Sequence, residues 1–169
     1  IRGAPDQSAS ELRYQGFRRA MQAHGLVVDP SLVYEGDFTF PSGVACANHL
    51  LAQRHRPTAV LASNDDMALG VLSAAQRLGL QVPAELSIAG FDDSPAATLV
   101  WPPLTTVRQP VEDMARLAVD MLVTPAAAGG DETPPRTSEA GLGHSASCTV
   151  RGLMRPSCGP SFRCAPRFS

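Results

Sequence analysis

The chain has 169 residues, of which 44% are hydrophobic and 18% charged, and its formal net charge is −2. These values are typical of one soluble globular domain or part of one, and they exclude a general attraction to polyanions. No apolar run approaches the ~20 residues that a membrane-spanning helix needs. The opening residues "IRGAPDQSAS" lack the pattern of a secretory signal. We therefore expect a cytoplasmic setting with reduced cysteines.

The first part of the chain predicts two helices on either side of an extended segment. Ser8 and Glu11 have the spacing of a capping box, and apolar residues at helical spacing follow them, which predicts a helix over 8–24. The residues "LVVDPSLVYEGDF" predict extended structure that is interrupted at Asp29–Pro30. A second helix is predicted over 42–54.

Short apolar strands alternate with helices in the middle of the chain. Strands are predicted over 58–63, 86–91 and 104–109, and helices over 66–78 and 110–123. This order predicts an α/β fold, a doubly wound parallel sheet with helices on both faces. The last helix has an apolar face made of Val111, Met114, Leu117, Ala118 and Met121.

Polar side chains follow two of these strands directly. Asn64 and Asp65 come after the strand 58–63, and Asp92 and Asp93 come after the next strand. The carboxyl ends of parallel strands meet at one edge of a sheet, where ligands of such folds bind. The sequence therefore predicts a polar ligand site at this edge.

These carboxylates have simpler interpretations as well. Asp65 and Asp66 are in position to cap the helix 66–78 and to complement its dipole. Asp92 is in position to end its strand through an Asx-turn with Ser94. A carboxylate-dependent hydrolase is a third alternative. However, the edge carries no accompanying base or nucleophile, and we predict no enzymatic activity.

The composition changes after residue 124. Residues 125–169 are rich in Pro, Gly and Ser, which predicts a disordered tail after a partial folded domain over 1–124. Within this tail only "SCTVRGL" could add a strand. "GLGHSA" lacks the strand and helix of a dinucleotide site, and we predict no cofactor. We also predict no metal, because no standard zinc finger has the spacing of His144, Cys148, Cys158 and Cys164.

Four motifs together resemble one family of bacterial proteins. They are "ELRYQGFRRAM", "SNDDMALG", "VPAELSIAGFDD" and "PPLTTVRQP". Over about residues 1–123 the chain resembles the effector-binding core of lactose-repressor (LacI/GalR) transcription regulators. The resemblance implies two lobes like those of periplasmic sugar-binding proteins, here mostly the C-terminal lobe and incomplete. It also implies operator DNA binding through a headpiece absent from this chain. The tail departs from the usual final strands of the family, as a frameshift would produce.

The resemblance also implies which residues face the effector. Arg13 would hold two hydroxyls of a sugar or a carboxylate, and an aromatic ring would cover the apolar face of the ligand. Such a set suits a small sugar-like effector. Arg13 has the alternative of an ordinary solvated charge, and Phe38 that of a core residue, with Phe40 competing for the aromatic role. The implied effector-binding residues are Arg13, Phe38, Asn64, Asp92 and Gln109.

A homodimer through the C-terminal lobe is the other implied partner. Gly70 lies in a helix interior, where glycine costs roughly 1 kcal/mol relative to alanine, so we expect another backbone to approach it closely. The alternative is that the leucines of this helix pack only on their own sheet. A further alternative to the regulator is the sugar-binding lobe of a transport-type solute-binding protein. The candidate interface residues are Leu69, Leu72, Gln76 and Leu80.

Overall fold

The computed structural model describes residues 1–123 and 150–151. Strands and helices alternate as predicted, and each helix begins and ends within three residues of its predicted bounds. The predicted boundary at residue 124 lies outside the described residues. So do the "GLGHSA" motif and the four residues considered as metal ligands, His144, Cys148, Cys158 and Cys164. The elements are α1 Ser8–Ala23, the 3-10 helix η1 Pro30–Leu32, α2 Phe40–Leu51, β1 Ala59–Leu61, α3 Asp65–Arg77, β2 Ser87–Ala89, the 3-10 helix η2 Pro95–Thr98, β3 Thr106–Val107, α4 Val111–Val123 and β4 Val150–Arg151.

Parallel strands form the centre of the fold. β1 pairs with β2 in parallel, with Val60 opposite Ile88. A parallel bridge between Ala89 and Thr105 places the segment that leads into β3 on the other side of β2. β3 then pairs in antiparallel with β4, which lies at Val150–Arg151 within "SCTVRGL", the segment that could add a strand.

The sheet continues beyond β1 through the first residues of the chain. The Ser63 N–H donates to the Ile1 carbonyl at 3.0 Å. Arg2 forms a parallel bridge with Glu35 on its other side. The N-terminal segment therefore lies between β1 and the segment around Glu35. This strand order, with helices as crossovers, is that of the predicted doubly wound parallel sheet.

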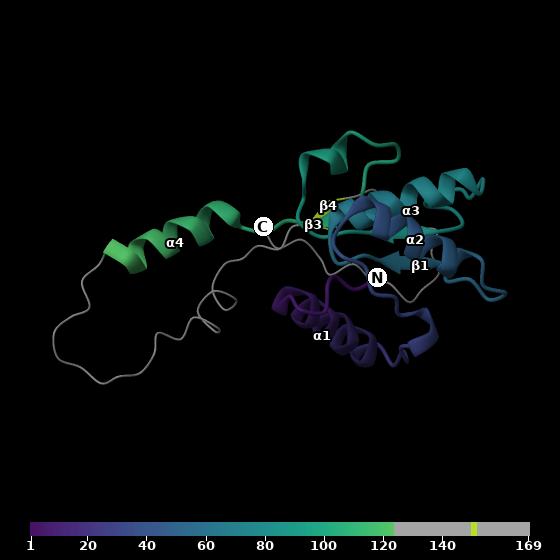
Figure 1. Ribbon diagram of the computed structural model, residues 1–169, viewed down its shortest axis with the longest axis horizontal. Helices are drawn as coiled ribbons and strands as arrows, with labels where there is room; N and C mark the ends of the chain where they lie inside the picture. The colour runs from purple at the N-terminus through teal and green to yellow at the C-terminus, as the bar shows by residue number, and fades with distance from the viewer. Residues whose placement is uncertain (124–149, 152–169) are drawn as a thin grey trace.

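One face of the sheet carries the core. Figure 1 shows α2 and α3 on one side of β1 and α1 on the other. Side chains alternate between the two faces of a strand. Accordingly Val60 is 6% exposed beneath α2 and α3, whereas the next residue, Leu61, is 40% exposed. The largest apolar side chains of this core include Leu50, Met67, Val71, Leu86 and Ile88.

Glycine lets α2 and α3 approach closely. A Cβ atom at Gly70 would lie 2.5 Å from the Phe40 carbonyl oxygen and 2.7 Å from the Val44 nitrogen. Both atoms belong to the backbone of α2, so neither can move without distorting that helix. The predicted close approach of a backbone at Gly70 is confirmed, but that backbone is the chain's own helix. Gly70 therefore gives no support to a dimer.

The second face of the sheet is covered only in part by the described residues. Ser10 is the only buried residue of α1, and α4 has none. Figure 1 shows α4 extending away from the main body. Its apolar face does not pack on the sheet, as a helix covering that face would, and Val111 and Met114 are 62% and 57% exposed. The periodicity predicted the helix correctly, but it does not say which surface the helix contacts.

The predicted capping box at the start of α1 is wrong. Gln7 is the N-cap residue, Ser8 is already helical, and no side chain caps the helix. Glu11 instead accepts a hydrogen bond from the Arg2 guanidinium at 2.7 Å. The arginine competes successfully because a charged donor binds a carboxylate more strongly than a backbone N–H does. No helix in the described part of the chain is long and apolar enough to cross a membrane.

Candidate functional site

The five residues implied as effector contacts lie near one edge of the sheet. Asn64 follows β1, Asp92 follows β2 and Gln109 follows β3, so parallel pairing brings them to the same edge. The Asp92–Arg108 bridge continues the pairing of β2 and β3 up to this point. Arg13 reaches the edge from α1, and Phe38 reaches it from the loop before α2.

Arg13 connects the ends of two strands. One of its terminal nitrogens donates to the Ser63 carbonyl at 2.5 Å, and the other lies 3.5 Å from Oδ1 of Asp92. Its guanidinium carbon lies 4.1 Å from the centre of the Phe91 ring and 5.9 Å from that of Phe38. Cation–π attraction and the fixed planar shape of the group hold it in this orientation. Arg13 is therefore not an ordinary solvated charge.

Asp92 keeps one oxygen available. Gln109 donates a hydrogen bond to Oδ1, the same oxygen that faces Arg13. Oδ2 of Asp92 accepts no hydrogen bond from the described residues. The side chain is 35% exposed, so part of it is open to a ligand.

The surroundings of Asp92 oppose its ionisation. Partial burial raises the pKa of Asp92 above its ordinary value. The hydrogen bond from Gln109 and the charge of Arg13 lower the pKa of this carboxyl, but they do not cancel the effect of burial. The Asp65 and Asp66 carboxylates raise it further. An additional hydrogen-bond donor would therefore stabilise the ionised carboxylate of Asp92.

Asn64 has a structural role that the sequence did not favour. Its Oδ1 accepts from the Met67 N–H at 3.0 Å, which makes Asn64 the N-cap of α3. Its Nδ2 donates to the Phe38 carbonyl at 2.8 Å. Because Asn64 takes the N-cap position, Asp65 and Asp66 cannot, and the cap interpretation of those two residues is wrong. Their charges still lie in the first turn, where the helix dipole favours them.

Asp65 is instead a buried hydrogen-bond acceptor. It is 1% exposed, its Oδ2 accepts from the Ser94 N–H at 2.7 Å, and its Oδ1 accepts from the Thr106 hydroxyl at 2.5 Å. The proposed Asx-turn between Asp92 and Ser94 is therefore also wrong, because Asp65 takes the Ser94 donor. Asp93 pairs with Arg108 at 2.5 Å.

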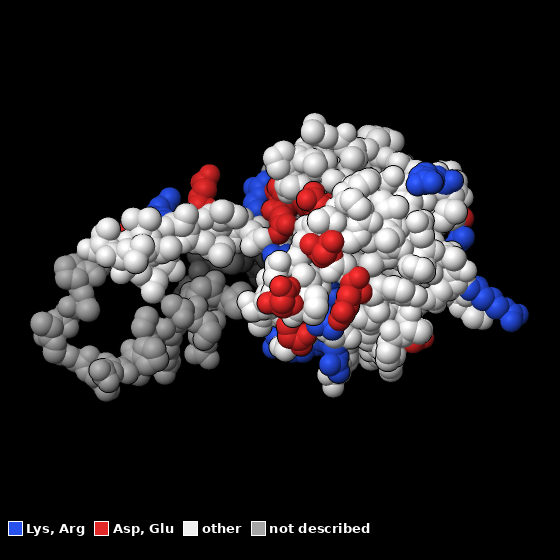
Figure 2. Space-filling model, in the orientation of Figure 1, with Lys and Arg blue, Asp and Glu red and all other residues white. Residues whose placement is uncertain are grey.

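Acidic and basic side chains are mixed around this edge. Figure 2 shows acidic groups gathered on the part of the main body nearest to α4, with arginines among them. Arg2–Glu11, Arg13–Asp92 and Arg108–Asp93 are three such pairs. Each of these three arginines is therefore paired with a carboxylate, and the Asp65 and Asp66 carboxylates lie nearby as further acidic groups.

The sequence and the fold match known proteins. The family model described as periplasmic binding protein-like domain matches residues 1–143. The HTH-type transcriptional repressor PurR of Haemophilus influenzae is 42% identical over 123 residues, which are 73% of this chain and 37% of that repressor. The chain belongs to the LacI family of periplasmic binding protein-like domains.

Solved structures of this family superpose on the chain. The transcriptional regulator CelR in complex with cellobiose has a TM-score of 0.69 and 40% identity, over 75% of this chain and 40% of that one. The lac repressor dimer bound to operator and the anti-inducer ONPF has a TM-score of 0.67 and 32% identity, over 72% and 42%. These relatives are transcription regulators and not enzymes. The chain spans less than half of their length.

In this member of the family, sequence reasoning missed Phe91 and Thr106 and misjudged Asp65. Phe91 looked like the end of a buried strand, yet its ring stacks on the Arg13 guanidinium. Thr106 looked like an ordinary β-branched strand residue, yet its hydroxyl contacts Asp65. Only strict alternation along β3, which turns Thr106 inward, could have indicated that this hydroxyl needs a buried partner.

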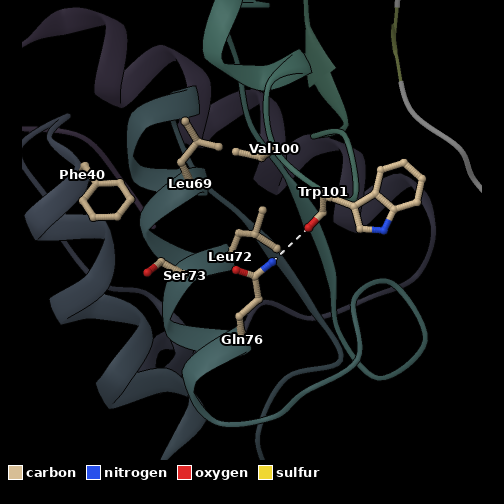
Figure 3. Close-up of a pocket in the computed structure, with 7 residues that line it drawn as sticks. All are labelled: Phe40, Leu69, Leu72, Ser73, Gln76, Val100 and Trp101. Atoms are coloured by element: carbon tan, nitrogen blue, oxygen red, sulfur yellow. Dashed lines mark hydrogen bonds between the residues drawn. The ribbon is translucent and has the colours of Figure 1, made fainter.

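A shallow apolar hollow lies on a different part of the surface, beside α3. Figure 3 shows Leu69, Leu72 and Gln76 lining it, with the Gln76 side chain donating to the Trp101 carbonyl at 2.9 Å. Phe40 from the start of α2 also lines it. Leu72 is 4% exposed, whereas Trp101 is 80% exposed. Leu80 lies outside the hollow and packs partly buried against the core.

Proposed function

We propose that this chain is the ligand-sensing part of a sugar-responsive bacterial transcription regulator. It binds a small, neutral, sugar-like effector beside Arg13, Asp92 and Gln109, and it acts in the cytoplasm. Ligand closure then controls operator binding through a DNA-binding headpiece outside these 169 residues. Support comes from the relatives, which are repressors, and from the CelR structure, which contains cellobiose.

One observation carries the choice of a neutral ligand. The Arg13 guanidinium already faces the Asp92 carboxylate, so the pair has no net charge to attract an anion. Oδ2 of Asp92, which accepts no hydrogen bond from the described residues, is an acceptor for a sugar hydroxyl. Arg13 has more N–H groups than its two present bonds use. The rings of Phe38 and Phe91 offer apolar faces that suit the C–H surface of a sugar. Asn64, whose amide is already bonded twice, is a lesser contact in this proposal.

A titration of the purified protein with ribose, cellobiose and gluconate tests this proposal. We expect saturable heat from a neutral sugar and none from gluconate, the anionic control. Asp92→Asn should weaken the binding of that sugar about 10- to 100-fold, because a hydrogen bond to a charged group is worth ~1.5–3 kcal/mol. Asp66→Asn, which changes an exposed carboxylate of the same region, should bind like the wild type. Binding of gluconate alone, or an Asp92→Asn protein with unchanged affinity, would contradict the proposal.

The proposal includes a homodimer that uses the hollow beside α3. Leu69, Gln76 and the exposed Trp101 are the residues that a partner would contact most, since Leu72 and Leu80 are already largely covered. The lac repressor structure, which is a dimer, is the relative that supports this part.

A further inference from the structure

The turn that carries Asp92 has an unfavourable backbone conformation. Asp92 has φ 126° and Asp93 has φ 57°, and both values lie in the region that favours glycine. Such conformations are unfavourable for residues other than glycine and persist only where their surroundings hold them in place. The turn would therefore relax, and Asp92 would turn its carboxylate elsewhere, unless specific contacts held the backbone.

Three successive N–H groups provide those contacts. The Asp92 N–H donates to the Val107 carbonyl at 2.8 Å, and the Asp93 N–H donates to the Thr106 hydroxyl at 3.2 Å. The Ser94 N–H donates to Oδ2 of Asp65 at 2.7 Å. The first bond is ordinary sheet pairing. The other two depend on side chains.

Asp65 organises both of the side-chain contacts. Its Oδ1 accepts a hydrogen bond from the Thr106 hydroxyl. This leaves a lone pair of the Thr106 oxygen directed at the Asp93 N–H, which donates to it. Thr106 is 1% exposed, like Asp65, so neither group has water as a substitute partner. An unsatisfied donor here would carry the full penalty of burial. Gly90 makes room for this arrangement, because a Cβ atom at that position would collide with Oδ1 of Asp65.

We propose that Asp65 and Thr106 are positioning residues, which hold the turn 92–94 so that Asp92 presents its carboxylate between Arg13 and Gln109. The proposal rests on the proposed function, since it assigns the purpose of this geometry to effector binding. Both residues are too buried to touch an effector, so they act through Asp92 alone. The Thr106 hydroxyl is the group to remove in a test, because among the described residues it alone connects Asp65 to the Asp93 N–H.

Two threonines in the same strand region provide a matched test. Thr106→Val keeps the shape of the side chain and the charge of the site but removes the hydroxyl. Thr106→Ser keeps the hydroxyl and is the conservative rescue. Thr105→Val makes the same chemical change at a neighbouring residue whose hydroxyl makes no hydrogen bond to the described residues. Each purified protein is titrated with cellobiose and with ribose, and its melting temperature is measured.

We expect Thr106→Val to lose at least tenfold in affinity for the sugar that the wild type binds, while Thr106→Ser and Thr105→Val retain it. The side-chain amide resonance of Gln109 should shift in Thr106→Val alone, because its bond to Asp92 weakens. A purely structural role would lower the melting temperature without moving this resonance. If Thr106→Val does not fold, Asp65→Asn replaces it. The asparagine side chain has one oxygen and one NH2 group, so it cannot accept hydrogen bonds on both sides as the two oxygens of Asp65 do.

Three results would overturn the proposal. The first is a Thr106→Val protein that folds and binds sugar like the wild type. The second is a Thr106→Ser protein as impaired as Thr106→Val, which would assign the effect to the lost methyl group. The third is equal loss in Thr105→Val. If the wild type binds neither sugar, the proposed function fails instead. The Gln109 resonance then still decides the positioning role, and its constancy in Thr106→Val would reject that role.

Discussion

Asp92 and Asp65 show how differently two neighbouring carboxylates are used. Asp65 is almost fully buried, with both oxygens bonded to donors of its own chain. Asp92 is partly buried, with both of its contacts on one oxygen and a raised pKa. The first arrangement stabilises the fold. The second leaves a charged group incompletely satisfied, which is the usual condition of a binding residue.

The raised pKa of Asp92 predicts the pH dependence of stability. A carboxyl whose pKa is higher in the folded state than in the unfolded state binds protons more tightly when folded. Its stabilising contribution is therefore complete below the unfolded value, near 3.8, and is lost as pH rises through the folded value. Asp92→Asn should consequently melt higher than the wild type at pH 7, with the difference shrinking towards pH 3. Thermal unfolding at both pH values measures this, and a variant that melts lower at pH 7 would contradict it.

Gly70 is a residue where packing overrides local preference. Gly70→Ala should destabilise the fold by about 1–3 kcal/mol, because the new methyl group meets the α2 backbone, and this outweighs its higher helix propensity. Gly16→Ala is the control, since nothing lies within 4 Å of a Cβ at Gly16 in α1. That change should stabilise the protein by roughly 0.5–1 kcal/mol. Chemical denaturation gives both values, and equal effects at the two sites would refute the packing argument.

At the scale of elements, the starts of α1 and α3 differ in how they are capped. α3 has a side-chain cap from Asn64, which also ties the helix to the loop before α2. α1 has no side-chain cap, although Ser8 and Glu11 suggested one. A capping pattern in the sequence shows which side chains could cap a helix. Competing hydrogen-bond partners decide whether the cap forms.

This difference predicts unequal effects of two alanine substitutions. Asn64→Ala should cost about 0.5–2 kcal/mol of unfolding free energy, the usual value for a lost N-cap. Ser8→Ala should change it by less than about 0.5 kcal/mol, because the Ser8 hydroxyl caps nothing. Urea denaturation of both proteins tests the prediction. A Ser8→Ala protein as destabilised as Asn64→Ala would restore the capping box.

At the scale of the whole molecule, apolar surface is unevenly distributed. The sheet face beneath α2 and α3 is well covered, whereas the hollow beside α3 is open and the apolar side chains of α4 are exposed. Exposed apolar patches on a soluble protein commonly mark contacts with other surfaces.

The open hollow predicts self-association. Sedimentation of the purified protein at micromolar concentration should show a dimer, and Leu69→Arg should shift it to a monomer by placing an unpaired charge in the interface. Leu12→Arg, at a 62% exposed position on α1, is the control and should leave the dimer intact. A wild type that sediments as a monomer with and without sugar would reject the interface.

The sequence by itself determined the alternation of strands and helices, the parallel sheet and the edge where polar residues gather. Hydrophobic periodicity reports the burial of each element, and in a parallel sheet the positions after successive strands meet at one edge. The four motifs likewise identified the family. Arg13, Asn64 and Asp92 could be placed near this edge for these reasons alone.

Only the tertiary structure decided which atoms these residues contact. Asp65 and Asp92 are equivalent in sequence, each an acidic residue after a buried strand, yet Asp65 joins residues 29 and 41 positions away. Such partners depend on where distant segments lie in space, which no local pattern encodes. The same reason explains why the backbone near Gly70 proved to be that of α2 and why the apolar face of α4 packs on none of the described residues. A residue's chemistry states what it can bind, and the packing of remote elements selects what it does bind.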